Sequence, residues 1–202
     1  MSLQFLITSL IVVIAPGAGV LITLAAGLAH GRRASLVAAF GCTLGILPHM
    51  LAAITGLAAL LHASSIAFQT LKYVGAAYLL YMAWMALKDQ GALHVHAHAA
   101  PRSAWEIIRH AVLVNAFNPK LSIFFLAFLP QFIGADAADP TVVMLEQSAV
   151  FMAMTLGVFA IYGVCAATLR DRVLSRPAVL KWMRGGFAAV FLGLGLKLAS
   201  GN

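Results

Sequence analysis

The stretch LQFLITSLIVVIAPGAGVLITLAAGLA, residues 3–29, decides the fold class. It contains no charged residue, and it is longer than the roughly 20 apolar residues that cross the hydrocarbon core of a bilayer as a helix. Pro16 and Gly17 interrupt it near the middle, where a proline removes a main-chain donor and clashes with the preceding helical turn. The run therefore predicts a transmembrane helix that is broken at Pro16 and Gly17.

Other apolar runs of similar length follow along the chain. Together with the first, they predict six transmembrane helices, at residues 3–29, 35–61, 66–87, 111–134, 143–169 and 185–200. Hydrophobic residues make up 62% of the 202 residues and charged residues 9%, which is far from the composition of a soluble domain. The sequence predicts a single all-α transmembrane domain, residues 1–202, surrounded by the lipid bilayer.

The basic residues of the loops lie on one side of this predicted bundle. They occupy the connections at 30–35, 88–110 and 170–184, whereas the connections at 62–65 and 135–142 have no Lys or Arg. Because basic loops stay in the cytoplasm, the asymmetry predicts that both chain termini lie outside the cytoplasm. The same clustering explains the net charge of +7 as membrane topology, so we expect no nucleic-acid partner.

The longest predicted loop divides the chain into two groups of three helices. Asn118, Pro119 and Lys120 interrupt the fourth run, as Pro16 and Gly17 interrupt the first. With three spans each, the two halves must be inverted repeats, and broken helices at corresponding positions of such repeats typically form a solute site. We therefore expect a cavity between the first and fourth spans and a role in solute transport. Structural kinks are the alternative interpretation.

Polar side chains near the second break are the candidate substrate ligands. Asn115 and Asn118 need hydrogen-bond partners in hydrocarbon, which either a neighbouring helix or a ligand can supply. Lys120 in mid-membrane costs roughly 2.5 to 3.5 kcal/mol, so it either faces the interior or extends to the cytoplasmic surface. In the interior it would bind a substrate carboxylate, aided by the positive end of the helix that follows Pro119.

Proton coupling would require a titratable group inside the membrane. All six acidic residues lie in loops or at span ends, which leaves His49 as the candidate because imidazole titrates near neutral pH. A neutral histidine packed in the bundle is the alternative. We expect no catalytic residue, no cofactor and no enzymatic activity. The predicted substrate pathway contains Pro16, Gly17, His49, Asn115, Asn118, Pro119 and Lys120.

Two further functions remain open at this point. His94, His96 and His98 alternate in a predicted loop and would share one side of an extended segment, which suggests a divalent-metal site and a metal exporter. A flexible polar loop explains the same residues. A membrane thiol-disulfide relay would require Cys42 and Cys165 to meet, although they belong to different predicted spans.

Small residues recur at helical spacing. Gly27 and Gly31 form one GxxxG motif, and Gly41 and Gly45 form another. Such motifs allow helices to approach closely, either inside one chain or across a homodimer interface. The sequence leaves both interpretations open.

Four segments resemble the lysine exporter (LysE/RhtB-type) family of bacterial amino-acid exporters. They are APGAG at 15–19, GRRASLVAAFGCTLGILPHMLAAITGLAALL from Gly31, LKYVGAAYLLYMAW from Leu71 and, most specifically, NAFNPKLSIFFLAFLPQF from Asn115. The resemblance covers most of the chain. It implies a six-helix secondary transporter of the bacterial inner membrane that exports amino acids, homoserine lactones or related metabolites, driven by the membrane potential or a proton gradient.

The resemblance matches residues 16–17 to the family's first proline motif and residues 118–120 to its second. The family usually has Pro-Gly-Pro followed by a polar or acidic residue, where this chain has Ala18 and Gly19. A frequent acidic residue after the second GxxxG motif is Ile46 here. These departures favour a neutral amino acid or a homoserine- or threonine-like substrate over lysine or arginine, and they argue against carboxylate-based proton coupling.

Overall fold

The computed structural model describes residues 1–15, 17–62, 103–134 and 137–168, with isolated positions between 70 and 88 and between 185 and 199. All regular secondary structure in this part of the chain is helical, without a strand. The helices predicted at 66–87 and 185–200 fall largely outside the described residues, so the six-helix architecture stays a prediction.

The helices follow in chain order as α1 (Leu3–Ile14), α2 (Ala18–Leu44), α3 (Leu47–His62), α5 (Ala104–Ala116), α6 (Pro119–Ile123) and α7 (Pro140–Thr168), with a π-helix, η1 (Phe124–Phe128), and a 3₁₀ turn, η2 (Leu129–Phe132), after α6. By length and composition alone, two helical segments of the described chain could cross a membrane: Pro140–Thr168, and Ala18–Gly56, which however reverses at Gly31. A third qualifies if Ala104–Ala116 and Pro119–Phe132, which are bent by 49°, form one span.

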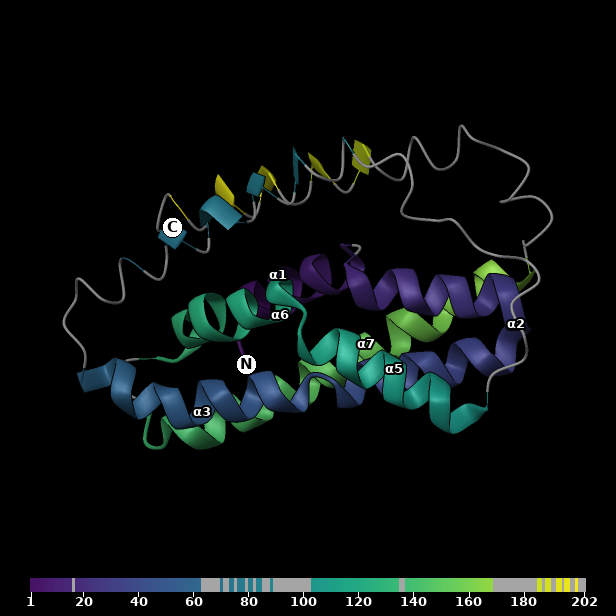
Figure 1. Ribbon diagram of the computed structural model, residues 1–202. Helices are drawn as coiled ribbons and strands as arrows, with labels where there is room; N and C mark the ends of the chain where they lie inside the picture. The colour runs from purple at the N-terminus through teal and green to yellow at the C-terminus, as the bar shows by residue number, and fades with distance from the viewer. Residues whose placement is uncertain are drawn as a thin grey trace.

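Helix α2 folds back on itself at Gly31. This residue has φ 81° and ψ −171°, a backbone conformation that glycine adopts at little cost. A continuous helix would hold Gly19 and Cys42 about 35 Å apart. Instead, Cys42 Sγ lies 3.6 Å from the Gly19 carbonyl oxygen. The two arms of α2 are therefore antiparallel (Figure 1), and the loop predicted at 30–35 is a tight reversal at one glycine.

An interruption that we did not predict separates α2 from α3. Pro48 has no main-chain N–H, so the carbonyl of Leu44 lacks its helical donor four residues later, and α2 ends at Leu44. After a short turn, α3 begins at Leu47. The turn positions His49, whose main-chain N–H donates to the Ile46 carbonyl at 3.0 Å, with its side chain buried in the bundle.

Helix α5 begins earlier than the sequence predicted. Ser103 and Glu106 form a capping box, in which the Ser103 hydroxyl accepts from the Glu106 N–H at 3.2 Å and the Glu106 carboxylate accepts from the Ser103 N–H at 2.9 Å. These bonds satisfy donors of the first turn. The fourth helix consequently starts at Ala104, and the end of the predicted 88–110 loop is helical.

Close packing inside the chain accounts for three glycines of the two GxxxG motifs. A Cβ atom added to Gly41 would lie 2.8 Å from Ala111 Cβ, and one added to Gly45 would lie 2.8 Å from Asn115 Cβ. A Cβ added to Gly27 would lie 2.5 Å from the Gly163 carbonyl oxygen. These contacts join α2 to α5 and α7. They agree with the first interpretation of the motifs and give no support to a homodimer interface.

The described parts of the basic connections lie at one end of the bundle. Figure 1 places the Gly31 reversal, the start of α5 and the end of α7 there. Arg32 Nη2 donates to Thr168 Oγ1 at 3.1 Å, which links the reversal to the end of α7. The start of α7, after exposed Asp139, lies at the opposite end (Figure 1). This separation agrees with the charge asymmetry that we used to predict the orientation.

Candidate substrate pathway at the two helix breaks

The first break frees a main-chain carbonyl, and Lys120 binds it. In a continuous helix the Val12 carbonyl would accept from the N–H of residue 16, but proline has none. Helix α1 ends at Ile14, and Nζ of Lys120 donates to the carbonyl oxygens of Val12 at 3.0 Å and Ala15 at 2.7 Å. Lys120 thus supplies the donor that Pro16 lacks, although Pro16 itself lies outside the described residues.

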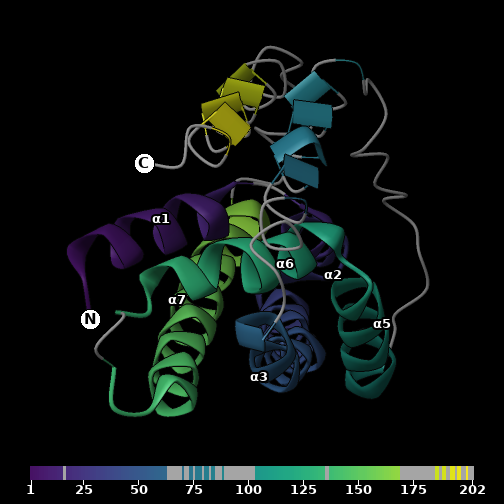
Figure 2. The same cartoon turned by 90° about the vertical axis from the view of Figure 1, so that its left-hand side faces the viewer.

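Local structure fixes the position of Lys120. Asn118 caps α6, its side-chain oxygen accepting from the Lys120 N–H at 3.1 Å, and Pro119 is the first residue of the helix. A glycine at position 17 leaves room for the lysine, because a Cβ atom there would lie only 3.1 Å from Lys120 Cε and 3.2 Å from Nζ. Figure 2 shows α6 beside the C-terminal end of α1. The amino group can therefore reach the end of α1 without leaving the interior.

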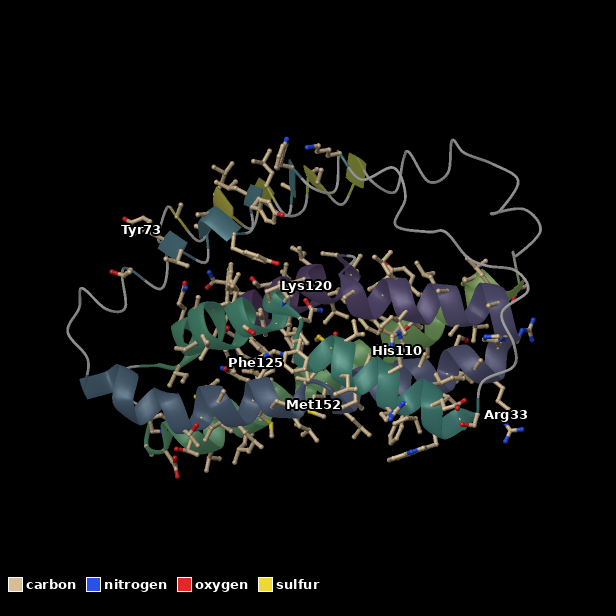
Figure 3. All side chains as sticks on the ribbon, in the orientation of Figure 1. Arg33, Tyr73, His110, Lys120, Phe125 and Met152 are labelled. Carbon is tan, nitrogen blue, oxygen red and sulfur yellow. The ribbon has the colours of Figure 1, made fainter. Side chains whose placement is uncertain are left out.

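Lys120 is an interior residue of the bundle and does not extend to its surface. Its exposed fraction is 4%. Figure 3 shows it part-way along the bundle, far from the end that carries Arg33. The structure therefore selects the interior position from the two that the sequence left open for this lysine.

The second break repeats the pattern with a histidine. Pro119 leaves the Asn115 carbonyl without a helical donor, and this oxygen lies 3.0 Å from His49 Nε2. Because a carbonyl only accepts, Nε2 carries the hydrogen. His49 Nδ1 lies 3.2 Å from Ser122 Oγ, and the imidazole stacks on Phe125 with ring centroids 6.4 Å apart. The second break is thus bound by a side chain held on both ring nitrogens.

Asn115 connects the two breaks. Its side-chain Nδ2 donates to the Cys42 carbonyl at 2.6 Å, and its Oδ1 accepts from Asn118 Nδ2 at 3.1 Å. A Cβ atom on Gly19, at the start of α2, would lie 2.8 Å from Asn115 Oδ1. The Asn115 amide therefore lies between α2, which follows the first break, and α5, which precedes the second.

Among the described residues, the site has one amino group, that of Lys120, and no acidic side chain against it. The acidic residues that the structure describes, Glu106, Asp139 and Glu146, are all exposed. The acceptors of the Lys120 amino group are main-chain carbonyls. Electrostatically, this arrangement suits a ligand that brings a negative group, because an ammonium in a low-dielectric interior is stabilised by an opposite charge.

Most of the predicted pathway comes together in this way. Gly17, His49, Asn115, Asn118 and Lys120 form one connected region, and the ring of Pro119 is exposed beside it. Sequence reasoning did not name the carbonyl acceptors, of which Val12 and Asn115 can be identified by counting back four positions from each proline. It also missed Tyr162 of α7, whose hydroxyl donates to the Ile14 carbonyl at 3.0 Å. No sequence signal pointed to that contact.

The two competing functions gain no support here. His94, His96 and His98 lie outside the described residues. Cys42 is buried, with Sγ 3.6 Å from the Gly19 carbonyl oxygen, whereas Cys165 is exposed on α7. A thiol relay requires two cysteines that meet, and these two belong to different environments.

Comparison with known proteins identifies the family. The model of the LysE type translocator family matches residues 10–202. The chain belongs to this family. As a LysE type translocator with long apolar helices, it is a membrane protein.

Similar proteins align with the translocator over nearly their whole length. An uncharacterized membrane protein of Vibrio cholerae is 33% identical over 98% of this chain and 96% of its own. A homoserine/homoserine lactone efflux protein of Salmonella typhi is 31% identical, covering 97% of this chain and 94% of its own. A leucine efflux protein of Klebsiella pneumoniae is 26% identical, covering 98% and 94%. No solved structure matches this translocator.

Proposed function

We propose that this translocator is a secondary transporter that exports neutral amino acids or homoserine- and threonine-like derivatives across the bacterial inner membrane, with no enzymatic step. The names of the similar proteins support the substrate class. Leucine, homoserine and homoserine lactone, the solutes in those names, all carry an amino group and have no charged side chain. The near-complete alignment supports extending this class to the present chain.

The proposal rests on Lys120. A buried ammonium beside two helix breaks is costly unless it has partners, and two carbonyl dipoles are its acceptors here. A substrate carboxylate would add a charge-assisted hydrogen bond to the same group. The amides of Asn115 and Asn118 lie next to it and would orient the rest of the solute.

Charge also favours neutral solutes over lysine or arginine. A cationic side chain at the same site would need a second negative partner, and the acidic residues that the structure describes are exposed. Ile46, where a family pattern often has an acid, is fully buried. The site as described thus suits a solute that has no charged side chain.

We further propose two inverted three-helix repeats that alternate access to this site by rocking against each other. The end of the bundle with Arg32 and Arg33 would face the cytoplasm, and both termini would then lie outside it. For His49 we propose a structural role at the second break, because both of its ring nitrogens have partners, and proton coupling by this imidazole is the alternative that a pH profile of efflux tests.

Efflux from proteoliposomes tests the proposal. Vesicles containing the wild-type protein are preloaded with leucine, homoserine, threonine and lysine, and release is followed under an imposed proton gradient or potential. We expect release of the neutral solutes and its loss in the Lys120→Ala variant. Lys88→Ala, which removes an exposed lysine, is the matched control and should transport normally. Wild-type vesicles that release every amino acid no faster than empty vesicles would refute amino-acid export.

A further inference from the structure

The end of α1 has the properties of a small ammonium-binding site. The carbonyl oxygens of Val12 and Ala15 converge on one nitrogen, Lys120 Nζ, at 3.0 and 2.7 Å. The carbonyl of Ile14, the residue before Ala15, accepts instead from the Tyr162 hydroxyl at 3.0 Å. The C-terminal end of a helix carries partial negative charge, so these oxygens favour a cation. A primary ammonium already occupies this place, and it comes from the protein itself.

We propose that the Val12 and Ala15 carbonyls bind the amino group of the exported solute, and that Lys120 occupies their site as a tethered substitute until the solute arrives. This inference rests on the proposed function and specifies which groups of the same site bind the substrate's amino group. The solute's amino group would take the two carbonyls, and the displaced Lys120 would meet its carboxylate when it has one. A solute without a carboxylate would still be bound through its amino group.

The exchange keeps both carbonyls hydrogen-bonded. One –NH₃⁺ group replaces another at the same two oxygens, so neither buried carbonyl is left without a donor at the end of the step. Leaving even one such oxygen unsatisfied would be unfavourable, which is why direct replacement is the easiest route. The positive charge of Lys120 remains at the site and becomes available to a negative group.

The local structure allows Lys120 to move without its helix. Its main-chain N–H is fixed by the Asn118 side chain at 3.1 Å, whereas the amino group is at the end of four flexible methylenes. Gly17 borders Cε and Nζ with a bare backbone, so no side chain of that residue confines the end of the lysine. The movement needed is a change of side-chain rotamer.

The test compares three ligands on the purified full-length protein in detergent. L-leucinamide has the amino group without a carboxylate, N-acetyl-L-leucine has the carboxylate without a basic amine, and L-leucine has both. We expect wild type to bind leucine most tightly, to bind leucinamide more weakly because the displaced Lys120 then meets no carboxylate, and not to bind N-acetyl-leucine. Lys120→Met removes the competing amino group but keeps the length and apolar stem of the side chain. If Lys120 fills the site 90 to 99% of the time, leucinamide should bind this variant about 10 to 100 times more tightly.

A second variant keeps the test decisive if Lys120→Met is unstable. A Cβ in Gly17→Ala would lie 3.1 and 3.2 Å from Lys120 Cε and Nζ and would displace the amino group while the lysine remains. Leucinamide should then bind several times more tightly, whereas Gly157→Ala, at a site with no atom within 4 Å, should leave its affinity unchanged.

The outcomes separate the inference from the proposed function. If leucine binds wild type but folded Lys120→Met or Gly17→Ala binds leucinamide equally or more weakly, Lys120 is no substitute for the substrate amine and the inference fails alone. Tight binding of N-acetyl-leucine by wild type would also overturn it. If folded wild type binds neither leucine nor leucinamide and transports no amino acid, the proposed function fails with it.

Discussion

Each of the two helix breaks leaves a carbonyl without its helical donor, and a different side chain replaces the donor at each break. At each, the carbonyl four residues before a proline accepts from a basic side chain in the other half of the chain. Lys120 binds the Val12 carbonyl of the first half, and His49 lies against the Asn115 carbonyl of the second. A proline in a membrane helix is tolerated when such a partner replaces the missing donor. Each break is therefore completed by the other half.

The difference between the breaks lies in how firmly the partner is held. The His49 ring has partners at both nitrogens and stacks on Phe125, and the Asn115 carbonyl also accepts from the Asn118 N–H at 3.1 Å. Lys120 is attached through the end of a flexible chain. The same proline pattern can therefore be combined with a firmly held partner, as at His49, which we call a fixed joint, or with a flexible one, as at Lys120.

Asn115→Leu should produce the largest effect, because Asn115 belongs to both breaks. The leucine would leave the Cys42 carbonyl and the Asn118 Nδ2 without this partner, at about 1–3 kcal/mol for each buried group. We expect a fall of about 2–6 kcal/mol in the free energy of unfolding and loss of leucine and homoserine efflux. Denaturant unfolding in detergent measures the first, and vesicle efflux the second. Unchanged stability would mean that the breaks are independent.

Gly19→Ala should have the next largest effect. Its Cβ would lie 2.8 Å from Asn115 Oδ1 and 2.8 Å from a ring carbon of Phe159. Overpacking of this kind costs about 1–3 kcal/mol, and here it pushes on the amide that links the breaks. We expect lower thermal stability and slower efflux. Gly157→Ala, an open helical position, is the control and should be neutral or slightly stabilising. Equal behaviour of the two variants would contradict the tight fit at Gly19.

The sequence predicted both breaks because prolines inside apolar runs act locally. The residues 16–17 and 118–120 could be identified from the letters alone, and the freed acceptors follow by counting back four positions. Pro48 carries the same signal, but the apolar run around it looked continuous, so the division of the second span between α2 and α3 was missed. The residues beyond 168 and most of those between 63 and 102 leave the predicted repeat untested.

The partners of the freed carbonyls could not be read from the sequence. Lys120 and Val12 are 108 positions apart, and Tyr162 and Ile14 are 148 apart, so their meeting depends on how the helices pack. The sequence left open whether Lys120 faced the interior and whether His49 was packed or functional. Tertiary packing shows that Lys120 faces the interior. Both His49 nitrogens have partners, and whether this histidine also has a role in transport is a question for the variant described next.

His49→Gln should affect export less than the first two variants if the second break is a fixed joint. A glutamine amide can still donate to the Asn115 carbonyl, which keeps its Asn118 donor in any case. We expect efflux within about tenfold of wild type, since one neutral hydrogen bond contributes about 0.5–1.5 kcal/mol. Efflux measured between pH 5.5 and 8 should keep its wild-type profile. A profile that becomes flat in this variant would instead make His49 the proton-coupling group.

Tyr162→Phe should have the smallest effect, and it separates the carbonyls at the end of α1 from one another. The variant removes only the hydroxyl that donates to the Ile14 carbonyl, on a half-buried side chain, so the expected loss is about 0.5–1.5 kcal/mol of stability. The Val12 and Ala15 carbonyls keep Lys120, and the affinity for leucinamide should therefore stay within about twofold of wild type. Tyr81→Phe, at an exposed tyrosine, is the matched control. If the affinity instead falls as far as it would on removal of a direct ligand, the ammonium site extends to Ile14. Tyr162 would then be needed to hold the end of α1 rigid, so that the Val12 and Ala15 oxygens converge on one ammonium.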